Sequence, residues 1–274
     1  MADGGSGHAL LEETRMLTEG VLATAGIDAI AVKPTECDVS RAADLAVETV
    51  TIDYEGREHL PDAETLVALA EEKTVRMTTP VRADGFDPLG DDERWSRLPE
   101  PVGRVLVAGH PAYLTDEEKQ RAIAPRLRTA RERAPDAWIG TESVERIALA
   151  VGGTQFELLS RSTERDLRAL RAAGFDGEIA VYAPLVVSDD EDAILDAVGA
   201  YAARRKPVRS ALPADAATDS TAEGRARSVL SKAARDYALV GDEDSVRTQT
   251  DRLREVGVDT VVGYPARGID AVGD

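Results

Sequence analysis

Several side chains that could do chemistry lie at the ends of short apolar runs, where a folded sheet would bring them to one edge. Lys33 and Asp53 each end such a run, Tyr182 ends a third, and His110 directly follows a fourth. A desolvated amine can act as a nucleophile, a carboxylate or imidazole as a general acid or base, and a phenol as a hydrogen-bond donor. His110, Asp53, Tyr182 and Lys33 are therefore the predicted catalytic residues.

A second set of polar side chains is expected inside the fold, because alternate residues of a barrel strand point inward. Arg76 and Thr78 belong to one apolar run and Glu157 to another, with apolar neighbours that would face outward. A lone buried charge is strongly destabilising, so the inward charges are expected to pair, and Asp53 and Arg76 could meet directly because they lie on adjacent strands. Arg76, Thr78, Glu157 and Glu142 are the predicted cofactor-binding residues; the alternative for the buried charges is a purely structural network.

Two glutamates follow strand-like runs closely. Glu36 follows the first run and Glu142 the fifth, and each would serve as an acid or base if buried, or as a helix cap if exposed. The chain has no His or Cys pattern with metal-ligand spacing and no glycine-rich phosphate loop of the known kinds. No transition-metal site is predicted, although Asp53 with a second carboxylate would suit Mg²⁺.

The densest basic run covers residues 204–209. It would either clamp an anionic cofactor or complement the dipole at a helix C-terminus, and the second interpretation is favoured because that helix should end away from the active face. Arg225 and Arg227 are the other candidates for such a clamp.

Eight short apolar runs alternate with stretches of helical spacing. The runs are 29–33, 49–53, 75–79, 105–109, 137–140, 155–159, 179–182 and 260–263. The helical stretches are 62–72, 116–132, 143–150, 163–173, 190–204 and 243–256. This alternation implies a mainly parallel sheet with helices outside, and eight strands favour a closed barrel over an open doubly wound sheet. The predicted fold is α/β, a (β/α)8 TIM barrel.

Some segments depart from this repeat. Residues 1–7 are polar and predicted to be disordered, and residues 9–25 are predicted as an extra N-terminal helix. Residues 80–103 would form a loop over the face where barrel active sites lie. Residues 207–236, which end in a helix, would form an insertion between strands seven and eight. We expect a single domain over residues 8–274.

The charge balance limits the partners. The chain has 51 acidic and 33 basic residues, a formal net charge of −18, and only five of the basic residues are Lys. This composition is typical of a halophilic, for example haloarchaeal, cytosolic protein. It argues against nucleic acid and anionic membranes as partners, because both attract basic surfaces. Cys37 is alone and no apolar run is long enough to span a bilayer, so the predicted location is cytoplasmic.

The C-terminal half carries a more specific pattern. Residues 237–265 read YALVGDEDSVRTQTDRLREVGVDTVVGYP: an apolar strand with a glycine, an acidic helix start, and a Gly-Val-Asp lead into the last strand. The residues that carry the pattern are Gly241, Asp242, Val246, Leu253, Gly257, Val258 and Asp259. Together with residues 137–140 and 179–205, this stretch resembles the bacterial-luciferase-like superfamily of flavin-dependent monooxygenases and deazaflavin (coenzyme F420) oxidoreductases.

This resemblance implies an oxidoreductase or monooxygenase that binds FMN or F420 in the mouth of a TIM barrel and acts on a small molecule. His110 and Tyr182 would contact the ring of the cofactor, and residues 80–103 would cover it. Relatives of this kind are often oligomers, so a homo-oligomer is expected as well.

Two other functions are compatible with the same residues. One is a lyase or aldolase, in which Lys33 would be the amine nucleophile or Asp53 and Glu157 would be the acid and base. The other is a non-catalytic barrel that has lost its cofactor, because the N-terminal half lacks the family's usual motifs.

The excess of carboxylates predicts a stability that rises with salt. Like charges repel one another at low ionic strength, and salt screens that repulsion. We expect the thermal midpoint, followed by circular dichroism, to rise by at least about 5 °C between about 0.1 M and about 2 M KCl. A midpoint that does not depend on KCl would contradict the interpretation of the charge.

Overall fold

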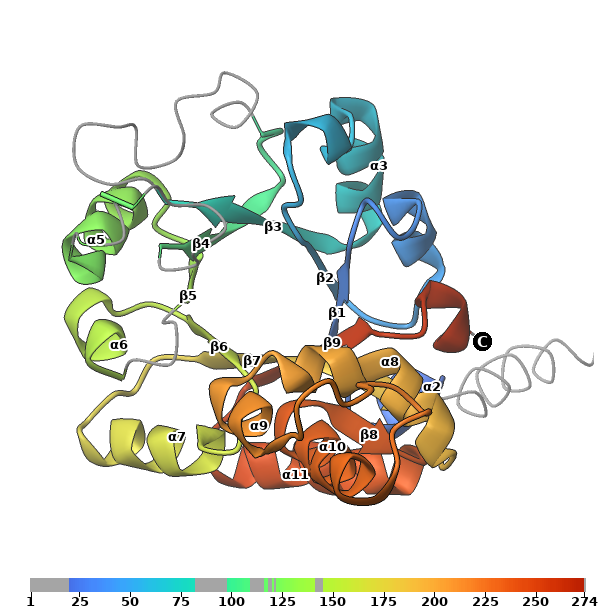
Figure 1. Ribbon diagram of the computed structural model, residues 1–274. Coiled ribbons are helices and arrows are strands. Elements are labelled where there is room, and N and C mark those ends of the chain that lie inside the picture. Colours follow the sequence, from blue (N-terminus) through green and yellow to red (C-terminus); the bar gives the residue numbers. More distant parts are fainter. Residues whose placement is uncertain are drawn as a thin grey trace, which may run out of the picture.

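Nine strands make up the sheet of the computed structural model, which describes residues 20–81, 98–108, 116–117, 120, 122–140 and 145–273. They are β1 Ala29–Val32, β2 Thr49–Ile52, β3 Thr74–Pro80, β4 Gly103–Val107, β5 Trp138–Gly140, β6 Gln155–Leu158, β7 Ile179–Val187, β8 Leu239–Gly241 and β9 Thr260–Pro265. All of these strands pair in parallel, and all but β8 form a closed ring (Figure 1). In the ring β9 lies between β1 and β7, and the pairing of β7 with β6 completes it. The predicted (β/α)8 barrel is confirmed.

Helices surround the ring (Figure 1). The α-helices are α2 Val21–Thr24, α3 Ala63–Glu72, α5 Ile123–Arg133, α6 Glu145–Val151, α7 Thr163–Ala172, α8 Glu191–Ala203, α9 Lys206–Ala211, α10 Gly224–Tyr237 and α11 Glu243–Glu255; the 3-10 helices are η1 Val39–Asp44, η2 Arg57–His59 and η5 Ile269–Ala271. Asp62, Asp190 and Asp242 cap α3, α8 and α11, because each carboxylate accepts a backbone N–H that the helix start leaves unpaired. Within the described ranges, no helix has the length and apolar character to cross a membrane.

Several predicted segments fall outside the described residues. These include the start at 1–7, most of the helix predicted at 9–25, and the greater part of the loop at 80–103. Of the N-terminal helix, only its C-terminal end is described, as α2. That end is held against α11, where the Thr250 hydroxyl donates to the Ala25 carbonyl oxygen at 3.1 Å.

The predicted insertion between the last two barrel strands is present, and β8 follows it, where the luciferase-like pattern of residues 237–265 implies an apolar strand. β7 extends five residues beyond the predicted end at Tyr182, and it is buried through Val186. The first half of β7 pairs with β6, up to Tyr182. Its last three residues pair with β8, from Leu185 with Leu239 to Val187 with Gly241. α8, α9 and α10 lie between β7 and β8 in the chain, and α8 packs against α10.

Register decides which side chains enter the lumen. A buried cluster inside the ring contains Ala29, Ala31, Val105, Trp138, Phe156, Ala180, Tyr182 and Val262. In the register of β6 with β7, Phe156 pairs with Ala180 and Leu158 with Tyr182, so these β6 residues point inward. The prediction that Glu157 lines the lumen is therefore wrong. The reason is that β6 turns its aromatic residue into the barrel, whereas the prediction assumed a polar interior.

A close backbone contact in the insertion gives a test of the fold. A Cβ atom at Gly199 of α8 would lie 2.3 Å from the Thr218 carbonyl oxygen. Replacing Gly by Ala inside a helix normally stabilises it by about 1 kcal/mol. Here we expect Gly199→Ala to destabilise the protein by about 1–3 kcal/mol, because helix and backbone must move apart. Urea unfolding measures the change, and a stabilised variant would contradict this packing of α8.

Candidate active site

A partly buried carboxyl and a buried phenol meet at the mouth of the barrel. Asp53 directly follows β2, and its backbone N–H donates to the Val32 carbonyl oxygen at 2.9 Å. The Tyr182 hydroxyl, from β7, donates to Asp53 Oδ2 at 3.1 Å. Since β2 and β7 are not neighbours in the ring, this bond spans the inside of the barrel. The structure thus brings together two of the four predicted catalytic residues.

Burial shapes the acidity of this pair. Burial raises the pKa of the Asp53 carboxyl from 3.8 to about 6, although the Lys33 charge and the Tyr182 hydrogen bond oppose that shift. Burial, followed by the Asp53 charge, raises the pKa of Tyr182 well above its ordinary value. The phenol therefore keeps its proton over the physiological range, while the carboxyl can gain or lose one near neutral pH.

Lys33 lies on the same rim, within a second polar group. Its Nζ atom is 3.1 Å from Glu36 Oε1 and 3.8 Å from the centre of the Tyr264 ring. The Tyr264 hydroxyl donates to the other oxygen of Glu36. Burial lowers the pKa of Lys33, but Tyr264 and Glu36 outweigh it, so the net shift is upward. Lys33 is therefore a fixed cation rather than a neutral amine.

Tyr264 is a site residue that sequence reasoning missed. Tyr264 is the next inward residue of β9 after Val262. The predicted strand stopped at residue 263, so counting one more alternate position would have found it. Burial raises its pKa to about 12. It joins the Lys33–Glu36 pair to Tyr182, because its ring stacks on that of Tyr182 with centroids 6.3 Å apart.

Aromatic rings fill the lumen below the mouth. Trp138 stacks on Phe156 with centroids 5.9 Å apart, and Phe156 meets Tyr182 edge-on at the same distance. With Tyr264, the row has a cation over each end: Lys33 over Tyr264 and Arg76 over Trp138, the latter at 4.6 Å. The site therefore has an apolar floor and a polar rim, an arrangement common in small-molecule sites.

Arg76 lies at the opposite end of the barrel from Asp53. It pairs in register with Gly103, the first residue of β4, and its Nη1 atom donates to the Asp136 carbonyl oxygen at 2.9 Å. The predicted Asp53–Arg76 pair is therefore wrong. The two residues belong to adjacent strands, but the register places Arg76 beside Thr51 and Asp53 above it.

The other predicted cofactor contacts have different places. The Thr78 hydroxyl accepts the Tyr54 backbone N–H at 2.6 Å, so it joins the ends of β2 and β3. Glu157 points out of the barrel, as the register of β6 shows. His110 and Glu142 follow β4 and β5 in the sequence and lie outside the described residues.

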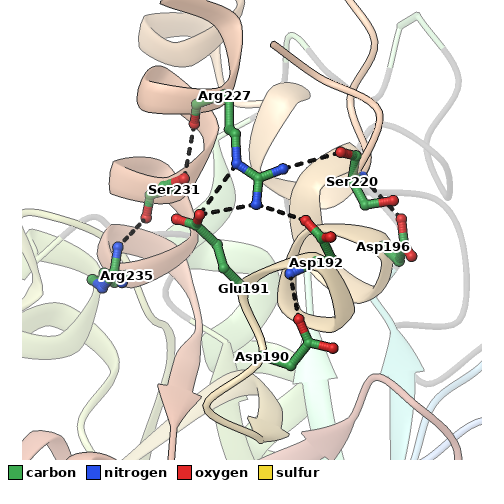
Figure 2. Close-up of polar contacts among 8 residues, drawn as sticks. All are labelled: Asp190, Glu191, Asp192, Asp196, Ser220, Arg227, Ser231 and Arg235. Atoms are coloured by element: carbon green, nitrogen blue, oxygen red, sulfur yellow. Dashed lines mark hydrogen bonds and ion pairs between the residues drawn. The ribbon is translucent and has the colours of Figure 1, made fainter. Parts of the chain in front are cut away.

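Two of the candidate phosphate clamps, Arg227 and Arg205, are engaged with neighbouring residues. Figure 2 shows the Arg227 guanidinium between Glu191 and Asp192 at the start of α8, with N···O distances of 3.0 and 2.6 Å. It also donates to the Ser220 carbonyl oxygen, so it ties α10 to α8 and to the loop before α10. In the basic run, Arg205 donates to the Tyr201 hydroxyl and lies 4.5 Å from the centre of its ring. Both arginines stabilise the insertion.

Comparison with known families identifies one match. A model of DUF7388, a family of unknown function, matches residues 22–272. No curated protein matches the sequence.

Solved structures share the fold. One is an F420-dependent secondary alcohol dehydrogenase in complex with an F420-acetone adduct, which is 13% identical with a TM-score of 0.55, over 90% of this chain and 98% of that one. Another is apo-MsnO8, which is 12% identical with a TM-score of 0.53, over 91% of this chain and 97% of that one. At such identities the likeness shows a common fold and nothing more.

The raised pKa of Asp53 predicts a pH-dependent stability. Because the folded pKa of about 6 exceeds the ordinary 3.8, the stability from Asp53 is full below pH 3.8 and is lost as the pH rises through about 6. Asp53→Asn cannot ionise and escapes this loss. We compare the free energy of unfolding of the variant with that of wild type at two pH values. The difference, variant minus wild type, should be more positive by ~2 kcal/mol at about pH 7 than at about pH 4. Urea unfolding of both proteins at molar salt measures the difference; equal differences at the two pH values would refute a buried, titrating Asp53.

Proposed function

The chain belongs to DUF7388, a family of unknown function, and we propose its function from its own site. The proposal is an oxidoreductase that binds FMN or the deazaflavin F420 at the barrel mouth and acts on a small molecule. The observation that carries it is the Asp53–Tyr182 pair, a near-neutral carboxyl held on an aromatic floor where barrel enzymes place their active sites. The F420-dependent alcohol dehydrogenase of the same fold supports the choice of cofactor class.

The side chains at the mouth fit a flavin-type ring in kind. Such a ring needs an apolar or aromatic face and hydrogen-bonding groups along its polar edge. Tyr182 and Tyr264 offer aromatic faces and hydroxyl groups, and Lys33 offers a charged donor. Asp53 and Glu36 offer acceptors. In this proposal Lys33, Tyr182 and Tyr264 hold the ring, and His110 remains a further predicted contact.

Each residue then has a distinct task. The bound cofactor would supply hydride or oxygen chemistry, which side chains do not provide. Asp53 would take up or release the accompanying proton, because a pKa of about 6 permits both directions near neutral pH. Tyr182 would stay protonated and keep Asp53 oriented. The ammonium of Lys33 would stabilise negative charge that develops at the mouth.

The lyase alternative has less support. An amine nucleophile must lose its proton, and enzymes achieve this by desolvation or by a neighbouring cation. Lys33 instead has Glu36 at 3.1 Å and a raised pKa. The geometry thus favours an electrostatic role for Lys33 over a Schiff base.

Binding of the cofactor tests the proposal directly. Purified protein is titrated at molar salt with FMN and with F420, and absorbance and fluorescence are recorded. We expect saturable binding of one of them, weakened by about 3–10-fold in Tyr182→Phe, because the variant loses a hydrogen bond worth about 1 kcal/mol.

Tyr237→Phe is the matched control. It removes a hydroxyl from another buried tyrosine, which packs among α8, α9 and α10 and not in the lumen. The affinity of Tyr237→Phe for the cofactor should equal that of wild type. If folded wild-type protein binds neither FMN nor F420, the oxidoreductase proposal fails and the non-catalytic alternative takes its place.

A further inference from the structure

A second hollow lies outside the barrel wall, where α7, the end of α10 and α11 meet. It has a volume of about 430 Å³. It is lined by Leu159, Ser160, Arg161, Thr163, Glu164, Arg165, Arg168, Arg235, Asp236, Leu239, Gln249, Arg252 and Leu253. We call this hollow the arginine groove, because five of its thirteen lining residues are Arg. It shares no lining residue with the Asp53–Tyr182 site.

The two carboxylates in the lining of the arginine groove are too few to neutralise its five arginines. Glu164 is paired with Arg168 at 3.0 Å, and Asp236 is paired with Lys232 at 2.9 Å. Arg161, Arg235 and Arg252 form no ion pair with any residue in the described part of the chain, and all three are exposed.

This concentration of cations runs against the character of the protein. The chain has a net charge of −18, and carboxylates outnumber basic groups overall. Neighbouring like charges repel one another, and an anion that binds among Arg161, Arg235 and Arg252 would reduce that repulsion. These arginines come from three different elements: the loop before α7, α10 and α11. Arg235 and Arg252 lie in the last turns of α10 and α11, where the helix dipole favours a cation, but Arg161 lies before the start of α7, where it does not.

The chemistry of the lining identifies the class of ligand. Arginine presents a planar fork of donors that matches phosphate oxygens two at a time, and the Ser160 and Thr163 hydroxyls lie in the same lining. A volume of about 430 Å³ exceeds that of one oxyanion and falls in the range of small-ligand pockets. We propose that the arginine groove binds a small molecule carrying two or more phosphate groups, independently of the site in the barrel.

Calorimetric titration with inorganic pyrophosphate in chloride buffer tests this proposal. Wild-type protein should bind one pyrophosphate per chain. The double variant Arg161→Gln with Arg252→Gln should bind at least tenfold more weakly, because it loses two forked donors. The double Lys variant at the same positions keeps the charge and should fall between the two, because lysine lacks the fork.

Arg209→Gln is the matched control. Arg209 is an exposed arginine on α9 and does not line the arginine groove. The affinity of this variant for pyrophosphate should stay within twofold of that of wild type. Thermal melts check that every variant is folded. A parallel titration with ADP distinguishes a nucleotide, which should bind more tightly, from a free diphosphate. The proposal is overturned if wild type shows no saturable binding of pyrophosphate, or if Arg209→Gln weakens binding as much as the double variant.

Discussion

Closure of the ring by β9 is the constraint on which the rest of the structure depends. β9 pairs with β1 on one side and with β7 on the other, so the first and last strands form one wall. Asp28 secures this closure, since its carboxylate accepts the Val261 backbone N–H at 2.7 Å and binds Arg254. Because register fixes which side chains point inward, closure also places Tyr264 between Lys33 and Tyr182.

The aromatic filling of the lumen sets the electrostatics of the mouth. The rings of Phe156 and Tyr182 exclude water from the underside of the polar rim, and a carboxyl in such surroundings resists ionisation. Asp53 therefore titrates near neutral pH even though Lys33 acts to lower its pKa. Lys33 stays charged because it has partners of its own in Glu36 and Tyr264. One rim thus carries a fixed cation and a titrating acid.

On the outer surface, arginines are also paired with carboxylates. Arg227 lies between two carboxylates at the start of α8 and serves the packing of the insertion (Figure 2). Arg171 likewise pairs with Asp259 beside the starts of β7 and β9. In a protein of net charge −18, such pairing is an expected use of arginine, and the arginine groove differs because five arginines line one hollow.

The amino-acid sequence by itself determined the barrel, since alternating apolar runs and helical stretches are local patterns. It also determined that Lys33 and Asp53 lie at the mouth, because each directly follows a parallel strand. Tyr182 is predicted there too, and it pairs with Leu158 at the end of β6 although its own strand continues to Val187. Alternation along the last strand also extends to Tyr264, although its contact with Tyr182 is a tertiary one. Only the tertiary structure decided that Phe156 points inward and that Arg76 lies far from Asp53. These outcomes depend on the register between strands, which closure of the ring fixes and no local pattern encodes.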